Sequence, residues 1–248
     1  MFEINKIILT LLSLLALEVM AKFPTDPKPC KYGDKTCIMS TIEYLMQEKS
    51  QGFASLNLVK TEPLKVAKIV IKQGAESPVN IDLTFTNNDL VGFSKIKMVD
   101  VKGFGKNLAT KHELYCTAST LSLIGDYSIK GRVLVLPITG TGISNITMVD
   151  SKIRIQFVGS PAEKSDGVYM DIKSVRMSVE PGKMIFNFGN LFNGDKILGE
   201  TMNAFLNENW KEIYQEVRAT FTKAFAQIFS SVINTVFSKY PYEKYFTE

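Results

Sequence analysis

The middle of the chain alternates apolar and polar residues. The alternation is unbroken over residues 79–86 and 152–157, and it returns in 168–172, 175–179 and 184–188. A period of two is typical of β-strands with one apolar face and one solvated face. Turn-forming residues, which we expect to separate the strands, occur at 87–89, 125–126, 160–161, 165–167 and 181–182. The pattern predicts an antiparallel meander of about eight or nine strands.

Two other segments have the helical period of three and four residues. Near the N-terminus, apolar residues recur at Ile38, Ile42 and Leu45, which predicts a short helix over 36–49. After Asp195 the same period continues to about residue 239. This spacing predicts one C-terminal helix of about 65 Å, at about 1.5 Å per residue.

The apolar stripe of the predicted long helix widens in its second half. Ala224, Phe229, Ile233 and Phe237 join the stripe there. A sheet with one apolar face needs a cover, and this helix offers a wide one. We therefore expect an elongated α+β fold, in which a strongly curved antiparallel sheet wraps around the C-terminal helix. Its interior is either a close-packed core or a lumen lined by hydrocarbon and aromatic side chains.

The first 21 residues have the pattern of a secretory signal peptide. An apolar run of eleven residues, 7–17, is too short to span a bilayer, and Val19 and Ala21 occupy the positions that a signal peptidase reads. An anchoring helix is the alternative. We expect residues 22–248 to form a single domain that is secreted and extracellular.

The cysteines fit an oxidising compartment. Cys30 and Cys37 lie close together after the signal peptide, and we expect them to form a disulfide. A metal site is the alternative, but no further ligand lies nearby and His112 is the only histidine of the chain. Cys116 lies in an apolar segment, where we expect a buried free thiol.

The sequence offers little for catalysis. A Ser-His-Asp arrangement would depend on His112 alone, which lies among polar residues of exposed character, and no Gly-x-Ser-x-Gly elbow occurs. We expect no enzyme, no cofactor and no metal. The formal net charge is only +4 and the basic residues do not cluster, so we expect no nucleic-acid partner.

Asn145-Ile146-Thr147 is a glycosylation sequon. It follows 140–142, which we interpret as a turn after a strand, and this favours exposure and glycosylation of Asn145. The alternative is that Ile146 begins another strand and holds Asn145 too close to the sheet.

Several segments together resemble a known family. Residues 191–195 (LFNGD), 198–199 (LG) and 205–210 (FLNENW) resemble the C-terminal signature of the takeout / juvenile-hormone-binding protein family of insects. Further matching elements, in chain order, are the pair Cys30 and Cys37, then 62–64 with Glu62 in place of Asp, 90–94, 125–131 and 136–142. The resemblance covers nearly all of the chain after the predicted signal peptide.

The resemblance implies a tubular lipid-binding fold with an internal apolar tunnel. It implies a secreted carrier that binds a small hydrophobic, juvenile-hormone-like ligand, such as a terpenoid, a fatty acid or another lipid, in this tunnel. The juvenile-hormone binders of the family have a second disulfide, whereas Cys116 has no cysteine partner here. The chain therefore resembles the takeout branch, and juvenile hormone itself is in doubt as the ligand. The alternative is an extracellular signalling or interaction protein with a solid core, acting through a protein partner. We expect a monomer without stable membrane insertion; contact with a membrane or receptor surface during ligand transfer stays open.

We expect apolar side chains from both helices and from the strands to line the ligand site. They are Ile42, Leu45, Leu83, Phe85, Phe93, Met98, Tyr127, Leu134, Met170, Phe186, Phe188, Phe221, Phe225, Ile228, Phe229 and Val232. The candidates for holding a polar end of the ligand are Tyr127, Tyr44, Ser230 and Ser231.

Overall fold

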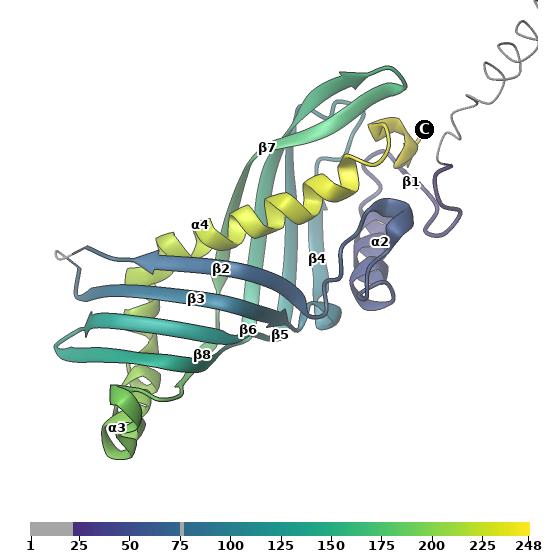
Figure 1. Cartoon of the computed structure of the whole chain (residues 1–248). Helices are drawn as coiled ribbons and strands as arrows, with labels where there is room; N and C mark the ends of the chain where they lie inside the picture. The colour runs from purple at the N-terminus through teal and green to yellow at the C-terminus, as the bar shows by residue number, and fades with distance from the viewer. Residues whose placement is uncertain (1–21, 75–76) are drawn as a thin grey trace, which may run out of the picture.

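The computed structural model describes residues 22–74 and 77–248. The predicted signal peptide, residues 1–21, lies outside the described residues. A strongly curved sheet encloses a long helix that runs along its inner side, with a shorter helix at each end of the molecule (Figure 1). The α-helices are α2 (Lys35–Gln47), α3 (Lys196–Glu208) and α4 (Trp210–Phe237).

One long hairpin organises the sheet. The strands of the seven-stranded sheet are β2 (Leu64–Lys72), β3 (Val79–Val91), β4 (Lys97–Lys102), β5 (Lys111–Val133), β6 (Leu136–Lys164), β7 (Gly167–Glu180) and β8 (Lys183–Phe188). β5 pairs along its whole length with residues 136–158 of β6, from Lys111 opposite Val158 to Val133 opposite Leu136. Every pairing within this sheet is antiparallel, as the sequence predicted.

The neighbours of this hairpin divide the sheet into two halves. In the β2–β3–β8 half, β3 pairs with residues 122–133 of β5, and β8 pairs with 144–149 of β6. In the β4–β7 half, β4 pairs with residues 113–117 of β5, and β7 pairs with 152–164 of β6. The same two strands therefore provide the floor of both halves, and only their neighbours differ.

Four predicted turns are wrong, because the residues lie inside strands. Residues 87–89 belong to β3, 125–126 to β5, and 140–142 and 160–161 to β6. Residues 87–89 form a bulge instead, where the β3–β5 register shifts. A bulge increases the local twist and bends the strand, so turn-forming residues here curve the sheet instead of ending a strand.

Gly125 allows close approach at this bulge. A Cβ atom at Gly125 would lie 2.5 Å from Oδ1 of Asn88. The Asn88 amide donates to the carbonyl of Val66, at 3.1 Å, and so links the bulge to β2. The predicted turns at 165–167 and 181–182 are confirmed, since they connect β6 to β7 and β7 to β8.

The single helix predicted over 195–239 is also wrong. The chain leaves helical geometry at Asn209, which has φ −103° and ψ 23° and separates α3 from α4. The Asn209 side-chain amide donates to the carbonyl of Phe205, at 2.8 Å, and so caps the end of α3. The break lets α3 pack against β8 while α4 packs against β7.

Three asparagines join the helices to open strand edges. The amide of Asn207 accepts from the N–H of Phe186 (2.7 Å) and donates to its carbonyl (2.9 Å). Asn203 pairs in the same way with Phe188 in β8, and Asn234 of α4 with Ile172 in β7. Each amide satisfies an N–H and a C=O that no strand covers. The positions of α3 and α4 are thereby fixed.

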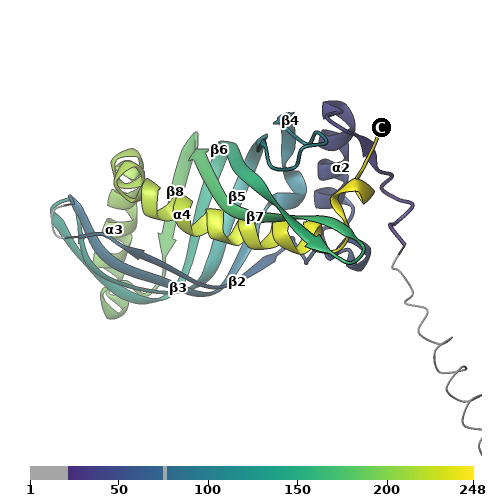
Figure 2. The same ribbon diagram turned by 90° about the horizontal axis from the view of Figure 1, so that it is seen from above.

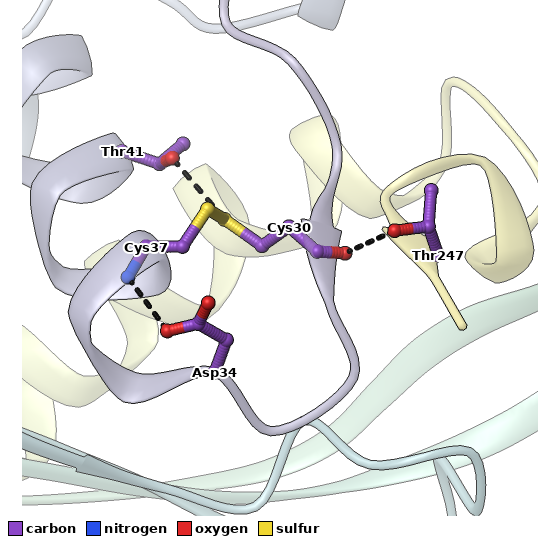
Figure 3. The surroundings of a disulfide bond; sticks show 5 residues. All are labelled: Cys30, Asp34, Cys37, Thr41 and Thr247. Carbon is purple, nitrogen blue, oxygen red and sulfur yellow. Dashed lines mark hydrogen bonds between the residues drawn. A yellow bond between two sulfur atoms is a disulfide. The ribbon is translucent and has the colours of Figure 1, made fainter.

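The predicted disulfide between Cys30 and Cys37 is confirmed (Figure 3). Asp34 accepts a hydrogen bond from the N–H of Cys37, at 3.0 Å, and caps α2. The short strands β1 (Cys30–Lys31) and β9 (Phe246–Thr247) pair in parallel. The N-terminal segment, α2 and the C-terminus therefore meet at one end of the molecule (Figure 2).

Candidate ligand-binding cavity

An apolar cavity of about 220 Å³ lies under the β4–β7 half. Its walls come from α2, the C-terminal turns of α4, residues 56–64 up to the start of β2, residues 93–96, the inner faces of β4, β5 and β6, and both terminal segments. The lining residues are Phe23, Pro27, Lys28, Pro29, Cys30, Ile38, Thr41, Ile42, Leu45, Met46, Leu56, Leu58, Thr61, Leu64, Phe93, Ile96, Met98, Phe104, Leu114, Cys116, Ile153, Ile155, Phe157, Phe229, Val232, Ile233, Val236, Phe237, Tyr245 and Phe246.

A second, smaller cavity of about 50 Å³ lies under the β2–β3–β8 half. Its lining residues are Ile69, Ile71, Ile81, Leu83, Phe85, Leu123, Ile129, Val133, Ile146, Met184, Phe186, Phe188, Leu206, Ile213, Val217, Phe221 and Phe225. The two linings share no residue. An engineered cavity that binds benzene has about 150 Å³, so a cavity of about 50 Å³ is too small for a lipid chain.

A half-buried carboxylate positions one wall of the larger cavity. Glu62 accepts hydrogen bonds from the N–H groups of Gly92 (2.9 and 3.1 Å) and Ser94 (2.9 Å). These bonds hold the 3₁₀ turn η2 (Phe93–Lys95), whose Phe93 ring meets the ring of Phe229 edge-on at 5.3 Å. The residue before this turn must be glycine, because a Cβ at Gly92 would lie 2.2 Å from the carbonyl oxygen of Thr120.

Aromatic rings from both ends of the chain close one end of the larger cavity. Phe23 packs against Tyr245, with ring centroids 5.2 Å apart, and Tyr245 packs against Phe237 at 5.0 Å. The hydroxyl of Tyr245 donates to the carbonyl of Val236 in α4. The C-terminal segment is therefore an ordered part of the cavity wall.

A family model described as haemolymph juvenile hormone binding protein (JHBP) matches residues 7–247. The chain belongs to this family. Members of the JHBP family are binding proteins and not enzymes, which confirms the prediction that this chain is no enzyme.

Individual relatives agree with this membership. The chain is 27% identical over 229 residues to the circadian clock-controlled protein daywake of Drosophila melanogaster, covering 90% of this chain and 88% of that protein. The daywake protein of Drosophila yakuba is 24% identical over the same length. The crystal structure of Takeout 1 of Epiphyas postvittana superposes with a TM-score of 0.77 at 21% identity, covering 89% of this chain and 100% of that one. This similarity confirms the predicted fold.

The residues predicted to bind ligand fall into three groups in this JHBP-family structure. Those that line the larger cavity are Ile42, Leu45, Phe93, Met98, Phe229 and Val232. Those that line the smaller cavity are Leu83, Phe85, Phe186, Phe188, Phe221 and Phe225. Those that line neither cavity are Tyr127, Leu134, Met170 and Ile228.

The third group has structural surroundings instead. The buried hydroxyl of Tyr127 donates to the carbonyl of Gly189 at 2.7 Å, and burial raises its pKa to about 12. Met170 is fully buried against Gly159, and Leu134 lies in the turn between β5 and β6. Ile228 is half-buried on α4.

The proposed polar anchors do not face either cavity. Tyr44 donates to Asp26, at 2.6 Å, and Ser230 and Ser231 lie outside both linings. Sequence reasoning missed Phe23 and Phe246, because no periodic pattern connects the two ends of a chain. It also missed Ile153, Ile155 and Phe157, although the alternation over 152–157 signalled their inward face.

His112 is buried, and the prediction of an exposed position is wrong. Its side chain is 0% exposed, with Nδ1 accepting from the N–H of Phe104 and Nε2 donating to the carbonyl of Leu108, both at 2.9 Å. The ring stacks on Phe157 at 5.1 Å, and burial lowers the pKa of His112. His112 therefore fixes the loop that carries Phe104 into the cavity wall.

The larger cavity contains one free thiol. Cys116 is buried and unpaired, as predicted, and burial raises its pKa to about 11, so the thiol is neutral. In the part of the chain that the structure describes, no three His, Cys, Asp or Glu side chains gather into a metal site. The helices within 22–74 and 77–248 include none long and apolar enough to cross a membrane.

Proposed function

We propose that this protein is a secreted carrier that binds one small hydrophobic molecule in the larger cavity. The observation that carries the proposal is a cavity of about 220 Å³ with almost wholly apolar walls. An engineered apolar cavity of about 150 Å³ binds benzene in another protein. Transfer of apolar surface from water contributes about 25 cal/mol per Å² before the costs of association. Membership of a family of hydrophobic-ligand binders supports the same function.

The proposed ligand is a terpenoid, a fatty acid or another lipid. The walls of its binding site would be formed by Ile42, Leu45, Phe93, Met98, Phe229 and Val232, together with the terminal aromatic residues. We propose that the smaller cavity belongs to the core and is not a second ligand site. We also propose that the larger and the smaller cavity join into one tunnel only if α4 moves.

Secretion and processing are part of the proposal. The description of the family as haemolymph proteins and the disulfide support a signal peptide over 1–21, followed by a single domain over 22–248. Asn145 is exposed in β6, and its side-chain oxygen accepts from the hydroxyl of Thr147, at 3.1 Å. This exposure supports glycosylation at Asn145.

A blocking substitution tests the carrier. Val232 lines the larger cavity, and the neighbouring Ser231 is exposed and lies outside both linings. We expect Val232→Trp to abolish binding of the fluorescent probe N-phenyl-1-naphthylamine, while Ser231→Trp binds it like the wild type. Circular dichroism checks that both variants fold.

Two results would contradict the proposal. If the wild-type protein, stripped of lipid by organic extraction, bound no hydrophobic probe, the carrier function would be lost. If Val232→Trp unfolded the protein as overpacking of a solid core does, an interaction protein with a packed interior would be favoured. Native mass spectrometry of the secreted protein adds an independent measurement, because a bound lipid appears as excess mass.

A further inference from the structure

The cavity wall contains few polar groups, and the protein already uses the hydroxyls among them. Thr61 donates to the carbonyl of Ser50 (3.4 Å), and Tyr245 donates to the carbonyl of Val236. The hydroxyl of Thr41 lies 3.5 Å from the disulfide sulfur of Cys30. A polar ligand group placed deep in this cavity would lose its water without gaining a partner, which is costly. The interior therefore selects a hydrocarbon chain.

Lys28 is the one charged residue in the lining, as far as residues 22–74 and 77–248 are concerned. Its side chain is exposed although the residue lines the cavity, so the cavity reaches the surface beside it. Lys28 takes part in none of the ion pairs of the described residues. A cation without a partner thus lies where a chain held in the cavity would leave the apolar interior.

The backbone on both sides of Lys28 is restricted. Pro27 and Pro29 flank it, and both line the cavity. Proline fixes its own φ and limits the residue before it, so the backbone of Lys28 needs little ordering when a ligand binds.

The segment that carries Lys28 is mildly basic. Lys22 and Lys31 lie on the same segment, and the one carboxylate among residues 22–31 is that of Asp26. Asp26 is not part of the lining, and its carboxylate accepts from the hydroxyl of Tyr44 at 2.6 Å. The net positive charge of residues 22–31 therefore favours an anion at the mouth of the cavity.

We infer that the ligand is a single-chain amphiphile with a carboxylate head, held with its hydrocarbon chain in the larger cavity and its carboxylate beside Lys28. This inference rests on the proposed carrier function and specifies its ligand class. A neutral terpenoid would gain nothing from Lys28, whereas a carboxylate gains a charge-assisted hydrogen bond and remains partly hydrated.

Competition between two matched ligands tests this assignment. Laurate and methyl laurate have the same hydrocarbon chain and differ in the charge of the head. We expect wild-type protein to bind laurate about fivefold more tightly than methyl laurate, because one solvent-exposed ion pair contributes about that much. Displacement of N-phenyl-1-naphthylamine measures both affinities. The preference should shrink when the salt concentration is raised from 20 to 500 mM.

Variants of the lysine separate its role from the general charge. We expect Lys28→Met to bind both ligands equally, with the affinity for methyl laurate unchanged, and Lys28→Arg to keep the preference for laurate. Lys31→Met is the matched control, since Lys31 is exposed and lies outside the lining; it should behave like the wild type.

The outcomes distinguish this inference from the proposed function. If the wild-type protein bound both ligands equally, or if Lys28→Met kept the preference for laurate, the carboxylate assignment would be wrong and the carrier function would stand. If neither ligand displaced the probe and the probe itself did not bind, the carrier function would fail as well.

Discussion

The two halves of the sheet share β5 and β6, yet one half contains a cavity of only about 50 Å³ and the other a cavity of about 220 Å³. In the β2–β3–β8 half, α3 is bound to β8 through Asn203 and Asn207, and the rings of Phe221 and Phe225 line the smaller cavity. In the β4–β7 half, Asn234 binds α4 to Ile172 in β7, at the edge of the sheet. The difference lies in where the covering helices are attached.

α2 completes the wider interior of the β4–β7 half. The carboxylate of Glu43 accepts from the N–H of Met98, at 2.6 Å, and so binds α2 to β4. With α4 held at β7 and α2 at β4, on opposite sides of this half, the larger cavity lies between the two helices and the sheet. In this half a void remains over β5 and β6. In the β2–β3–β8 half, the helices cover the same two strands directly.

Two phenylalanines one turn apart on α4 give the largest expected contrast. Phe225 is 2% exposed and lies in the β2–β3–β8 half, whereas Phe229 is half-buried and lines the larger cavity. We expect Phe225→Ala to lower the free energy of unfolding by about 4 kcal/mol, and Phe229→Ala by about half as much, because Phe229 already borders a void. Urea denaturation measures both. Equal losses would show that the two halves are packed alike.

The asparagines offer a smaller and more specific contrast. Asn203→Ala and Asn234→Ala each leave one N–H and one C=O of a strand without a partner, so we expect each to cost about 1–3 kcal/mol. Amide hydrogen exchange should quicken at Phe188 in the first variant and at Ile172 in the second. Only Asn234→Ala should weaken binding of the hydrophobic probe. An equal loss of probe binding in both variants would contradict the assignment of the ligand to the β4–β7 half.

The smallest expected effect is a pH dependence of the β4–β7 half. Burial lowers the pKa of His112 below its ordinary value of 6.5. The unfolded chain therefore takes up a proton near pH 6.5 while the folded protein stays neutral. The stability contributed by neutral His112 is complete above pH 6.5 and is lost as the pH falls toward the lowered pKa, by at most about 1.4 kcal/mol per pH unit.

The carboxylate of Glu113, the residue after His112, affects the stability of the protein at lower pH. The hydrogen bond from Lys111 holds the pKa of Glu113 below its usual value of 4.5, so its contribution is lost only in stronger acid. We expect His112→Gln to flatten the stability profile below pH 6.5, as measured by thermal unfolding. A profile that fell equally in wild type and variant would assign the loss to other groups.

The sequence by itself determined the inward face of most strands, the helix that became α2, the disulfide and the curved sheet around a C-terminal helix. These features follow from local rules, since a period of two or of three and four states which side of an element is apolar. The alternation over 79–86 and 152–157 predicted the burial of Phe85 and Phe157 correctly.

Tertiary structure alone decided which apolar side chains border the cavity. Periodicity tells which way Phe225 and Phe229 point, but not how far away the opposite wall is. That distance depends on where Asn234 and Glu43 attach their helices, on the bulge that replaces the predicted turn at 87–89, and on the break at Asn209. Phe23 and Phe246 reach the cavity through contacts between the two ends of the chain. A void is set by distances between elements, and these are fixed only when the whole chain has packed.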